Sequence, residues 1–240
     1  MVNSPIILAI DTVTQAQQLA LVEGDKVLAR RTHYSISNHA DSLLKNIEDM
    51  FVQQGIEGRK IDLVGVGVGP GSFTGARVGL AVAKAIALAA GAPILGVSSL
   101  LSMASPLLSV LPPSSTVASV IDARRSEVYF SLYAKDEHGK VNEILCAQSA
   151  SPEVFLEKSE GIKNLYVVGN ATRQVSQLKE CLQARENIVL PQPWDGPSSV
   201  SIALLAWEFF QERGADSLAD LEPNYVRLSD AEINYAKKNA

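Results

Sequence analysis

The chain has 240 residues, of which 47% are hydrophobic and 20% are charged, and its mean hydropathy is +0.11. Aromatic residues account for only 6%, so the apolar excess is aliphatic. Such a high apolar content excludes a disordered chain. It favours strands that are buried on both faces or a surface that a partner covers. The net charge of −5 disfavours a protein that holds a nucleic-acid backbone by itself. The two cysteines, Cys146 and Cys181, indicate neither a disulfide framework nor a cysteine zinc site, which fits a cytoplasmic protein.

Targeting and membrane segments are not predicted. The first five residues lack the basic residues of a signal peptide, and the apolar run that follows ends at Asp11. Residues 85–121 contain no charge, but prolines such as Pro106 and Pro112 interrupt them. A spanning helix needs about 20 apolar residues without such breaks, so we expect a buried helix–strand–helix instead.

Apolar runs and glycine turns predict the elements of the first half. Strands are expected at 6–10, 18–23, 26–32, 63–68 and 94–97, with helices at 38–54, at 76–90 and after Ser98. Gly24-Asp25 is a tight hairpin signal, and Asn38 is a candidate helix cap. The order is βββαβαβα.

The second half repeats this order more faintly. Strands are expected at 116–121, 127–134, 141–148, 165–168 and 188–190, with helices from Pro152, at 172–184 and at 198–213. Pro and Ser cluster within 105–115, which predicts a boundary there. We therefore expect an N-terminal lobe at 1–108, a C-terminal lobe at 109–222 whose last helix packs back on the first, and a polar tail at 223–240.

Two βββαβα units in tandem predict a duplicated α/β fold with mixed sheets. This element order is similar to that of the actin, Hsp70 and sugar-kinase superfamily, whose lobes are RNase H-like. The similarity concerns the fold and does not by itself assign a function.

The densest motif is the glycine loop at 69–75, Gly-Pro-Gly-Ser-Phe-Thr-Gly, between a predicted strand and helix. It has neither the Gly-Lys-Ser/Thr of a P-loop nor the spacing of a dinucleotide fingerprint. Two interpretations stay open. Gly71 and Ser72, with Asp11, are weak candidates for an anion site at the helix N-terminus. Alternatively, the loop is a structural turn that aims Phe73 and the next helix.

The helix at 76–90 carries only two charges, Arg77 and Lys84. A helix that is apolar nearly all round is buried on most sides. We expect the sheet to cover one side and the helix at 38–54 to cover part of the other. A partner subunit would cover the rest, unless the chain buries the helix alone.

Catalytic groups are sparse. His33, His39 and His138 form no HxxxH or HExxH pair, and no GxSxG elbow exists. Asp11 ends the first strand without a following glycine until Gly24, so a phosphate cradle is not predicted there. Asp11 is either a magnesium ligand acting through water or a residue that caps a turn.

A second polar group stands at Asp122-Ala-Arg124, with Glu127 and Tyr129 beyond it. The simplest interpretation is a hairpin tip with an Arg–Glu pair, and a functional role stays open.

These residues together resemble the TsaB (YeaZ) family of tRNA threonylcarbamoyladenosine (t6A) biosynthesis. The resemblance covers nearly the whole chain, from Ile7 to Arg227, with small departures at Val13 and Gln15. Its signature residues are Gly69, Pro70, Gly71, Phe73, Thr74, Gly75, Arg77, Asp122 and Arg124.

The resemblance implies a non-catalytic scaffold or activator subunit that pairs with the catalytic subunit TsaD and with the ATPase TsaE. The complex forms t6A at position 37 of tRNAs that read ANN codons. The resemblance also implies a homodimer when the partner is absent, and tRNA contact only through the partners. It implies no cofactor bound by this chain alone, and it leaves open whether a nucleotide binds at the complex interface. Pairing would use the first two helices, for which we predict contacts by Leu43, Ile47, Met50, Val78, Ala81, Val82, Ala85 and Ala89.

Two other classes of function remain as alternatives. One is a small ATP-dependent phosphotransferase that uses Asp11 and the glycine loop. The other is a metal-dependent hydrolase of the same superfamily, against which the lack of paired histidines argues.

Overall fold

The structure is a computed structural model that describes residues 4–34, 40–183, 188–189 and 194–227. Its strands are β1 (Ile6–Asp11), β2 (Ala16–Glu23), β3 (Lys26–Tyr34), β4 (Leu63–Gly67), β5 (Ile94–Val97), β6 (Thr116–Arg124), β7 (Glu127–Lys135), β8 (Val141–Ala150), β9 (Leu165–Val168) and β10 (Ile188–Val189). Its helices are α1 (Ala40–Gln54), the 3-10 turn η1 (Gly58–Lys60), α2 (Phe73–Ala90), α3 (Ser99–Val110), α4 (Pro152–Lys158), α5 (Ala171–Gln174), α6 (Ser176–Gln183) and α7 (Ser199–Arg213).

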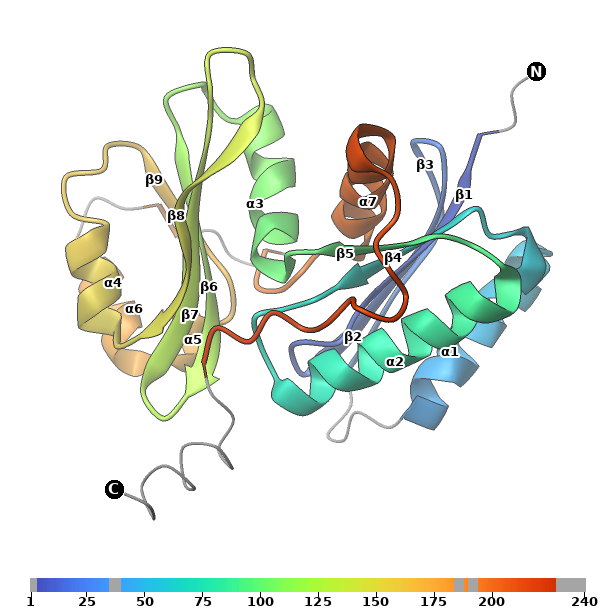
Figure 1. Cartoon of the computed structure of the whole chain (residues 1–240). Helices are drawn as coiled ribbons and strands as arrows, with labels where there is room; N and C mark the ends of the chain where they lie inside the picture. The colour runs from blue at the N-terminus through green and yellow to red at the C-terminus, as the bar shows by residue number, and fades with distance from the viewer. Residues whose placement is uncertain (1–3, 35–39, 184–187, 190–193, 228–240) are drawn as a thin grey trace.

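The described strands form two five-stranded sheets with matching topology. The first has the order β3-β2-β1-β4-β5 and the second the order β10-β9-β6-β7-β8. In each sheet, two antiparallel neighbours follow the first strand of the unit, and the later strands add in parallel on its other side. The duplicated two-lobed α/β fold is therefore confirmed (Figure 1).

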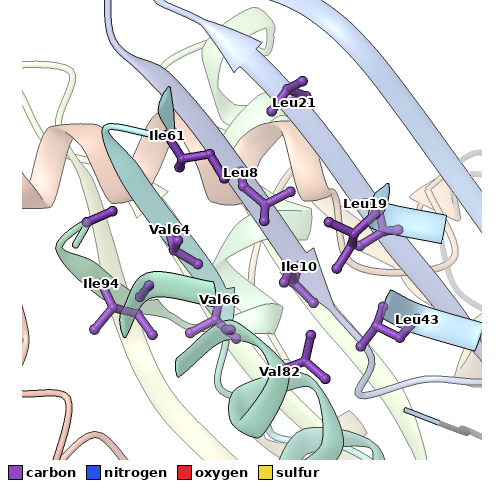
Figure 2. Packing of buried hydrophobic residues seen from close by; sticks show 14 of the residues in the cluster. Leu8, Ile10, Leu19, Leu21, Leu43, Ile61, Val64, Val66, Val82 and Ile94 are labelled. Atoms are coloured by element: carbon purple, nitrogen blue, oxygen red, sulfur yellow. The ribbon is translucent and has the colours of Figure 1, made fainter. Parts of the chain in front are cut away.

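Helices cover both faces of the first sheet. On one face, α1 and α2 lie side by side over a core that includes Leu8, Leu19, Val64 and Ile94 (Figures 1 and 2). Helix α7 packs on the other face, where Ile202 and Ala206 meet the alternate residues of β1, β2, β4 and β5. The sheet is thus apolar on both faces, as the continuous apolar runs of its strands predict.

The second sheet is covered in the same way. Helices α4 and α6 pack on its outer face, where Phe155 meets Phe130 edge-on with ring centroids 5.2 Å apart. Helix α3 packs on the face toward the first lobe, against β6 and β7. The predicted boundary after residue 108 would assign most of α3 to the first lobe, but its apolar side chains belong mainly to the core of the second.

Local sequence signals explain most element ends. Ser98 caps α3 by accepting a hydrogen bond from the N–H of Leu101, at 3.3 Å. Helix α2 begins at Phe73, three residues before its predicted start, because Ser72 caps it. The helix predicted at 172–184 is two helices, because Val175 has an extended backbone between α5 and α6. The predicted cap Asn38 and the neighbouring His39 lie outside the described residues.

By length and composition, α2 is the one helix in the described part of the chain that would fit a membrane span. Its inner side chains, such as Leu80, Ala83 and Ala87, are buried against the first sheet and α1. A core helix of this kind meets the same criteria as a span, so its apolar character has a structural explanation.

The C-terminal segment (214–227) returns from α7 to the first lobe and then reaches the second (Figure 1). Asp216 bonds to the backbone of Ile94 and Gly96 at the edge strand β5. Further on, the N–H of Asn224 donates to the carbonyl of Val68, at 2.7 Å. The segment therefore lies along the junction between the lobes, a position that its irregular, polar sequence does not predict.

Candidate partner-binding surface

The glycine loop packs against the turn that follows β1, which leaves no room for side chains. A Cβ at Gly71 would lie 2.5 Å from the carbonyl oxygen of Val13, and one at Gly67 would overlap the carboxylate of Asp11. The N–H of Ser72 donates to the Val13 carbonyl, at 2.7 Å. The close approach that these glycines permit is therefore made by the chain itself.

The polar groups at the start of α2 are also engaged within the chain. The Ser72 hydroxyl accepts from the N–H of Gly75, at 3.1 Å, and the Thr12 hydroxyl donates to the carbonyl of Gly75, at 2.6 Å. Of the two interpretations of the loop, this geometry favours the structural turn. Gly71 and Ser72 hold the turn and cap the helix, and they form no open cradle for an anion.

Asp11 is fully buried behind this turn. One carboxylate oxygen accepts from the N–H of Val13, at 3.0 Å, and the other from the hydroxyl of Ser99, at 2.6 Å. Burial disfavours the charged carboxylate and raises the pKa of Asp11 to about 6, although both hydrogen bonds act in the opposite direction. Asp11 therefore links β1 to the start of α3 rather than facing solvent. Among the described residues, no group of three His, Cys, Asp or Glu side chains is placed to hold a metal ion.

At the N-terminus of α2, Phe73 and Arg77 form a cluster with Tyr225 of the C-terminal segment. The Arg77 guanidinium lies 3.8 Å from the centre of the Phe73 ring, and its Nε donates to the Tyr225 hydroxyl, at 2.8 Å. The rings of Phe73 and Tyr225 have centroids 4.9 Å apart. Sequence reasoning predicted that the loop positions Phe73 but missed Tyr225, which lies 148 residues from Arg77 in the chain.

One side of α2 faces away from the sheet. Its exposed residues recur three and four apart, which places them on one stripe. They are Thr74, Arg77, Ala81, Ala85, Leu88 and Ala89. Leu88 is 74% exposed, a high value for a leucine on a helix that packs on a core.

The neighbouring helix α1 adds two exposed aliphatic residues, Leu44 and Val52, which are 45% and 75% exposed. Helices α1 and α2 are in contact with each other on one face of the sheet. We call their exposed apolar residues the two-helix face, which consists of Leu44, Val52, Ala81, Ala85, Leu88 and Ala89. Sequence reasoning missed Leu44, Val52 and Leu88. Their helical spacing relative to the buried positions would have found them.

The structure corrects four of the predicted contact residues. Leu43, Ile47, Met50 and Val82 are buried in the first-lobe core, where α1 and α2 meet the sheet, and Figure 2 labels two of them. Val78 is half-buried, whereas Ala81, Ala85 and Ala89 are exposed. The periodicity of an amphipathic helix identifies its apolar side, and here that side serves the chain's own core.

The C-terminal segment provides part of the cover for α2, for which the sequence left open either a partner subunit or burial within the chain. Leu218 and Leu221 pack on the first-lobe core, and the Lys84 ammonium donates to the carbonyl of Ala219, at 3.4 Å. A partner would therefore meet the remaining outer stripe and not the whole second side.

The hairpin tip between β6 and β7 differs from its predicted pairing. Arg124 pairs with Asp122, at 3.5 Å, while Glu127 pairs with Arg227 of the C-terminal segment, at 3.1 Å. Arg124, Arg125 and Ser126 all have positive φ, at 63°, 54° and 59°, in the tight turn that joins β6 to β7. Arg227 also donates to the Ala123 carbonyl, which ties the second lobe to the C-terminal segment.

Comparisons with known proteins agree on a family. A family profile described as TsaD, tRNA N6-adenosine threonylcarbamoyltransferase, matches residues 26–235. The tRNA threonylcarbamoyladenosine biosynthesis protein TsaB of Haemophilus influenzae is 31% identical, with 92% of this chain and 93% of the relative covered. The TsaB of Escherichia coli is 32% identical, with 92% and 94% covered. The chain belongs to the TsaB (YeaZ) family.

A solved structure agrees with this membership. The structure described as YeaZ from Pseudomonas aeruginosa superposes with a TM-score of 0.72 at 25% identity, covering 92% of this chain and 99% of that one. The resemblance that the sequence motifs indicate is therefore confirmed, and the two-lobed arrangement of this chain is shared with that structure over nearly its full length.

Proposed function

We propose that this TsaB family member is a non-catalytic scaffold or activator subunit in t6A formation at position 37 of ANN-decoding tRNAs. Its partners are a TsaD-like catalytic subunit and a TsaE-like ATPase, in the cytoplasm. When the catalytic subunit is absent, the same surface pairs two copies of this chain. The observation that carries the proposal is the two-helix face, with its exposed aliphatic residues on a well-packed pair of helices.

The composition of this face fits a helix-on-helix contact. Ala81, Ala85 and Ala89 are small and lie on one stripe of α2, so a partner helix can approach closely. Leu88 and Val52 supply larger apolar side chains that lose water on binding. The match of residues 26–235 to a TsaD profile supports a TsaD-like partner, because related chains offer similar helices for a pseudo-symmetric pair.

The internal engagement of Asp11, Gly71 and Ser72 supports a role without catalysis. Asp11 has its carboxylate bonded to Val13 and Ser99, and the glycine loop is filled by the turn after β1. A phosphotransferase would need these groups to face a nucleotide. A nucleotide held jointly with the catalytic subunit stays within the proposal, since it would bind at the complex interface.

The test is to place a charge on the two-helix face. Ala85→Glu puts a carboxylate on an exposed position, so the fold is kept while the apolar contact is broken. We expect the affinity for the TsaD-like subunit to fall at least about tenfold, with a matching loss of t6A formation in the reconstituted system. Affinity is measured by isothermal titration calorimetry, and the mass of the isolated chain by light scattering.

The matched control is Val110→Glu, which adds the same charge at the end of α3, where Val110 is 77% exposed. Helix α3 packs on the second sheet, away from the two-helix face. This variant should bind and support t6A formation like the parent. Normal binding by Ala85→Glu, or an equal loss in both variants, would contradict the assignment of the surface.

A further inference from the structure

The last four described residues of the C-terminal segment, 224–227, touch both lobes within a very short stretch of chain. The N–H of Asn224 donates to the carbonyl of Val68 in the first lobe, at 2.7 Å. Three residues later, the Arg227 guanidinium donates to the carbonyl of Ala123 in the second lobe, at 3.3 Å. Figure 1 shows the segment running beside α2 and reaching the second sheet. These residues therefore form a direct connection between the lobes.

The first-lobe end of this connection lies beside the two-helix face. Tyr225 accepts a hydrogen bond from Nε of Arg77, at 2.8 Å, and the Arg77 guanidinium also lies 5.6 Å from the centre of the Tyr225 ring. Arg77 belongs to the exposed stripe of α2 and stands one helical turn before Ala81, a residue of that face. A partner packed on the stripe would exclude water from Arg77 and Tyr225, which strengthens the interaction between them.

The second-lobe end of the connection holds the β6–β7 hairpin. Besides its bond to Ala123 of β6, Arg227 pairs with Glu127 of β7, at 3.1 Å, and the two side chains are 19% and 37% exposed. Glu127 also accepts a hydrogen bond from the hydroxyl of Ser149 in β8, at 2.7 Å. Arg227 thereby ties the C-terminal segment to the three antiparallel strands of the second sheet.

The tip of this hairpin needs support from outside. Residues 124–126 all have positive φ. Tight turns of this kind favour Gly, Asn or Asp, whereas the two arginines and the serine of this tip are sterically disfavoured in the left-handed region. A backbone in a disfavoured region persists only where neighbouring contacts maintain it. Arg227 makes such contacts on both sides of the tip, at Ala123 and at Glu127.

Between its two ends the connection has little slack to absorb a displacement. Tyr225 and Arg227 are two residues apart, so at most about 7 Å of chain joins them. Glu222, Asn224 and Tyr225 are exposed, so few buried contacts fix this part of the segment. A stretch that is short and weakly anchored is ordered by its ends, and fixing one end restricts the other.

We propose that the C-terminal segment couples the two-helix face to the β6–β7 hairpin. Binding of the catalytic subunit at α2 fixes Arg77 and Tyr225, and Arg227 then holds the hairpin tip in its disfavoured conformation. The coupling is reciprocal, so loss of the Arg227 contacts weakens binding at α2. This inference rests on the proposed function, because it takes the two-helix face as the site where the catalytic subunit binds.

The experiment compares amide hydrogen exchange in the full chain alone and in its complex with the TsaD-like subunit, whose binding is measured by calorimetry. We expect exchange in residues 122–128 to slow at least about fivefold when the subunit binds. Binding without a change in the exchange of these residues would overturn the coupling alone. Absence of binding would overturn the proposed function and the coupling with it.

Variants at the two ends of the connection distinguish coupling from direct contact between the subunit and the hairpin. Tyr225→Phe removes the hydrogen bond from Arg77 and keeps the ring, and Arg227→Gln removes the ion pair with Glu127. Both variants should bind the subunit about fivefold more weakly. At saturation, binding should no longer slow exchange in residues 122–128. Slowing that persists in both variants would show direct contact and overturn the coupling.

The matched control is Lys140→Gln. Lys140 pairs with Glu212 of α7, at 2.9 Å, so this variant also removes a cation from an ion pair between the lobes, but one that does not involve the C-terminal segment. It should bind the subunit and slow exchange in the hairpin like the parent. An equal loss of slowing in this control would contradict a connection through the segment.

Discussion

Asp11 illustrates how the fold uses an ionisable residue as an internal link. Its carboxylate joins the turn after β1 to Ser99 at the start of α3, and Ser99 in turn accepts from the N–H of Gly69. The sequence left two roles open for this residue, a magnesium ligand acting through water or a residue that caps a turn. The structure favours the second, because the N–H of Val13 donates to the Asp11 carboxylate within a buried hydrogen-bond network that holds the glycine loop.

This burial predicts a dependence of stability on pH. The pKa of Asp11 is about 6 in the folded chain and near its ordinary value of 3.8 when unfolded. Between these two pKa values the Asp11 carboxyl is protonated in the folded chain and ionised in the unfolded chain. The stabilisation that Asp11 contributes below pH 4 is therefore lost as the pH rises through 6. The side chain of Asp11→Asn cannot ionise, so this variant does not lose that stabilisation. The difference in the free energy of unfolding, variant minus parent, should therefore be roughly 2 kcal/mol larger at pH 7 than at pH 4.

Urea denaturation at pH 4, 5, 6 and 7 measures this difference. Asp25→Asn, in the exposed hairpin turn, serves as the control and should give a profile parallel to the parent. Parallel profiles for Asp11→Asn as well would show that the carboxylate is not buried in solution.

At the scale of elements, the C-terminal segment stabilises the start of α2. Tyr225 contacts Phe73 and accepts a hydrogen bond from Arg77, so the segment holds one end of the helix whose outer stripe we assign to a partner. Lys84 and Leu221 extend these contacts along the helix. The segment and the two-helix face therefore share one element.

Removing this contact should loosen the segment. Tyr225→Ala loses the ring contact and the hydrogen bond, and we expect the free energy of unfolding to fall by about 1–2 kcal/mol. Tyr225→Phe keeps the ring and should lose less than half as much. Urea denaturation gives both values, and limited proteolysis should cut Tyr225→Ala faster between residues 214 and 227. Equal stability of all three proteins would show that the cluster contributes nothing.

The elements also show what sequence can and cannot predict. The short strands and the Ser98 cap were predicted because their signals are local, namely an apolar run and a side chain that bonds three residues ahead. The break at Val175 was missed because no Pro or Gly marks it. Leu43 and Val82 were predicted to contact a partner but are buried in the core, because an apolar residue on a helix suits a core and an interface equally well. The Arg77–Tyr225 contact was missed because it joins residues far apart in the chain.

At the scale of the whole molecule, the net charge of −5 limits what the chain does alone. Proteins that bind nucleic acid nonspecifically use clustered cations, with Kd values on the order of 10⁻⁴ to 10⁻⁶ M at physiological salt. In the proposed complex, tRNA is held mainly by the partners.

We therefore expect the isolated chain to show no saturable tRNA binding below about 100 µM at physiological salt, because it lacks the charge to release counterions. Fluorescence anisotropy with labelled tRNA measures this, and the same titration with the TsaD-like subunit present should give clear binding. Micromolar affinity of the chain alone would contradict the indirect role.

The placement of α3 and α7 has a consequence for how the chain folds. Each unit ends in a helix that packs on the other unit's sheet, α3 on the second and α7 on the first. A fragment ending near residue 112 would lack α7 and leave one apolar face of its sheet open to water, and the complementary fragment would lack α3. The two halves are thus obligate folding partners, and a chain cut between them would regain its structure only when both pieces are present together.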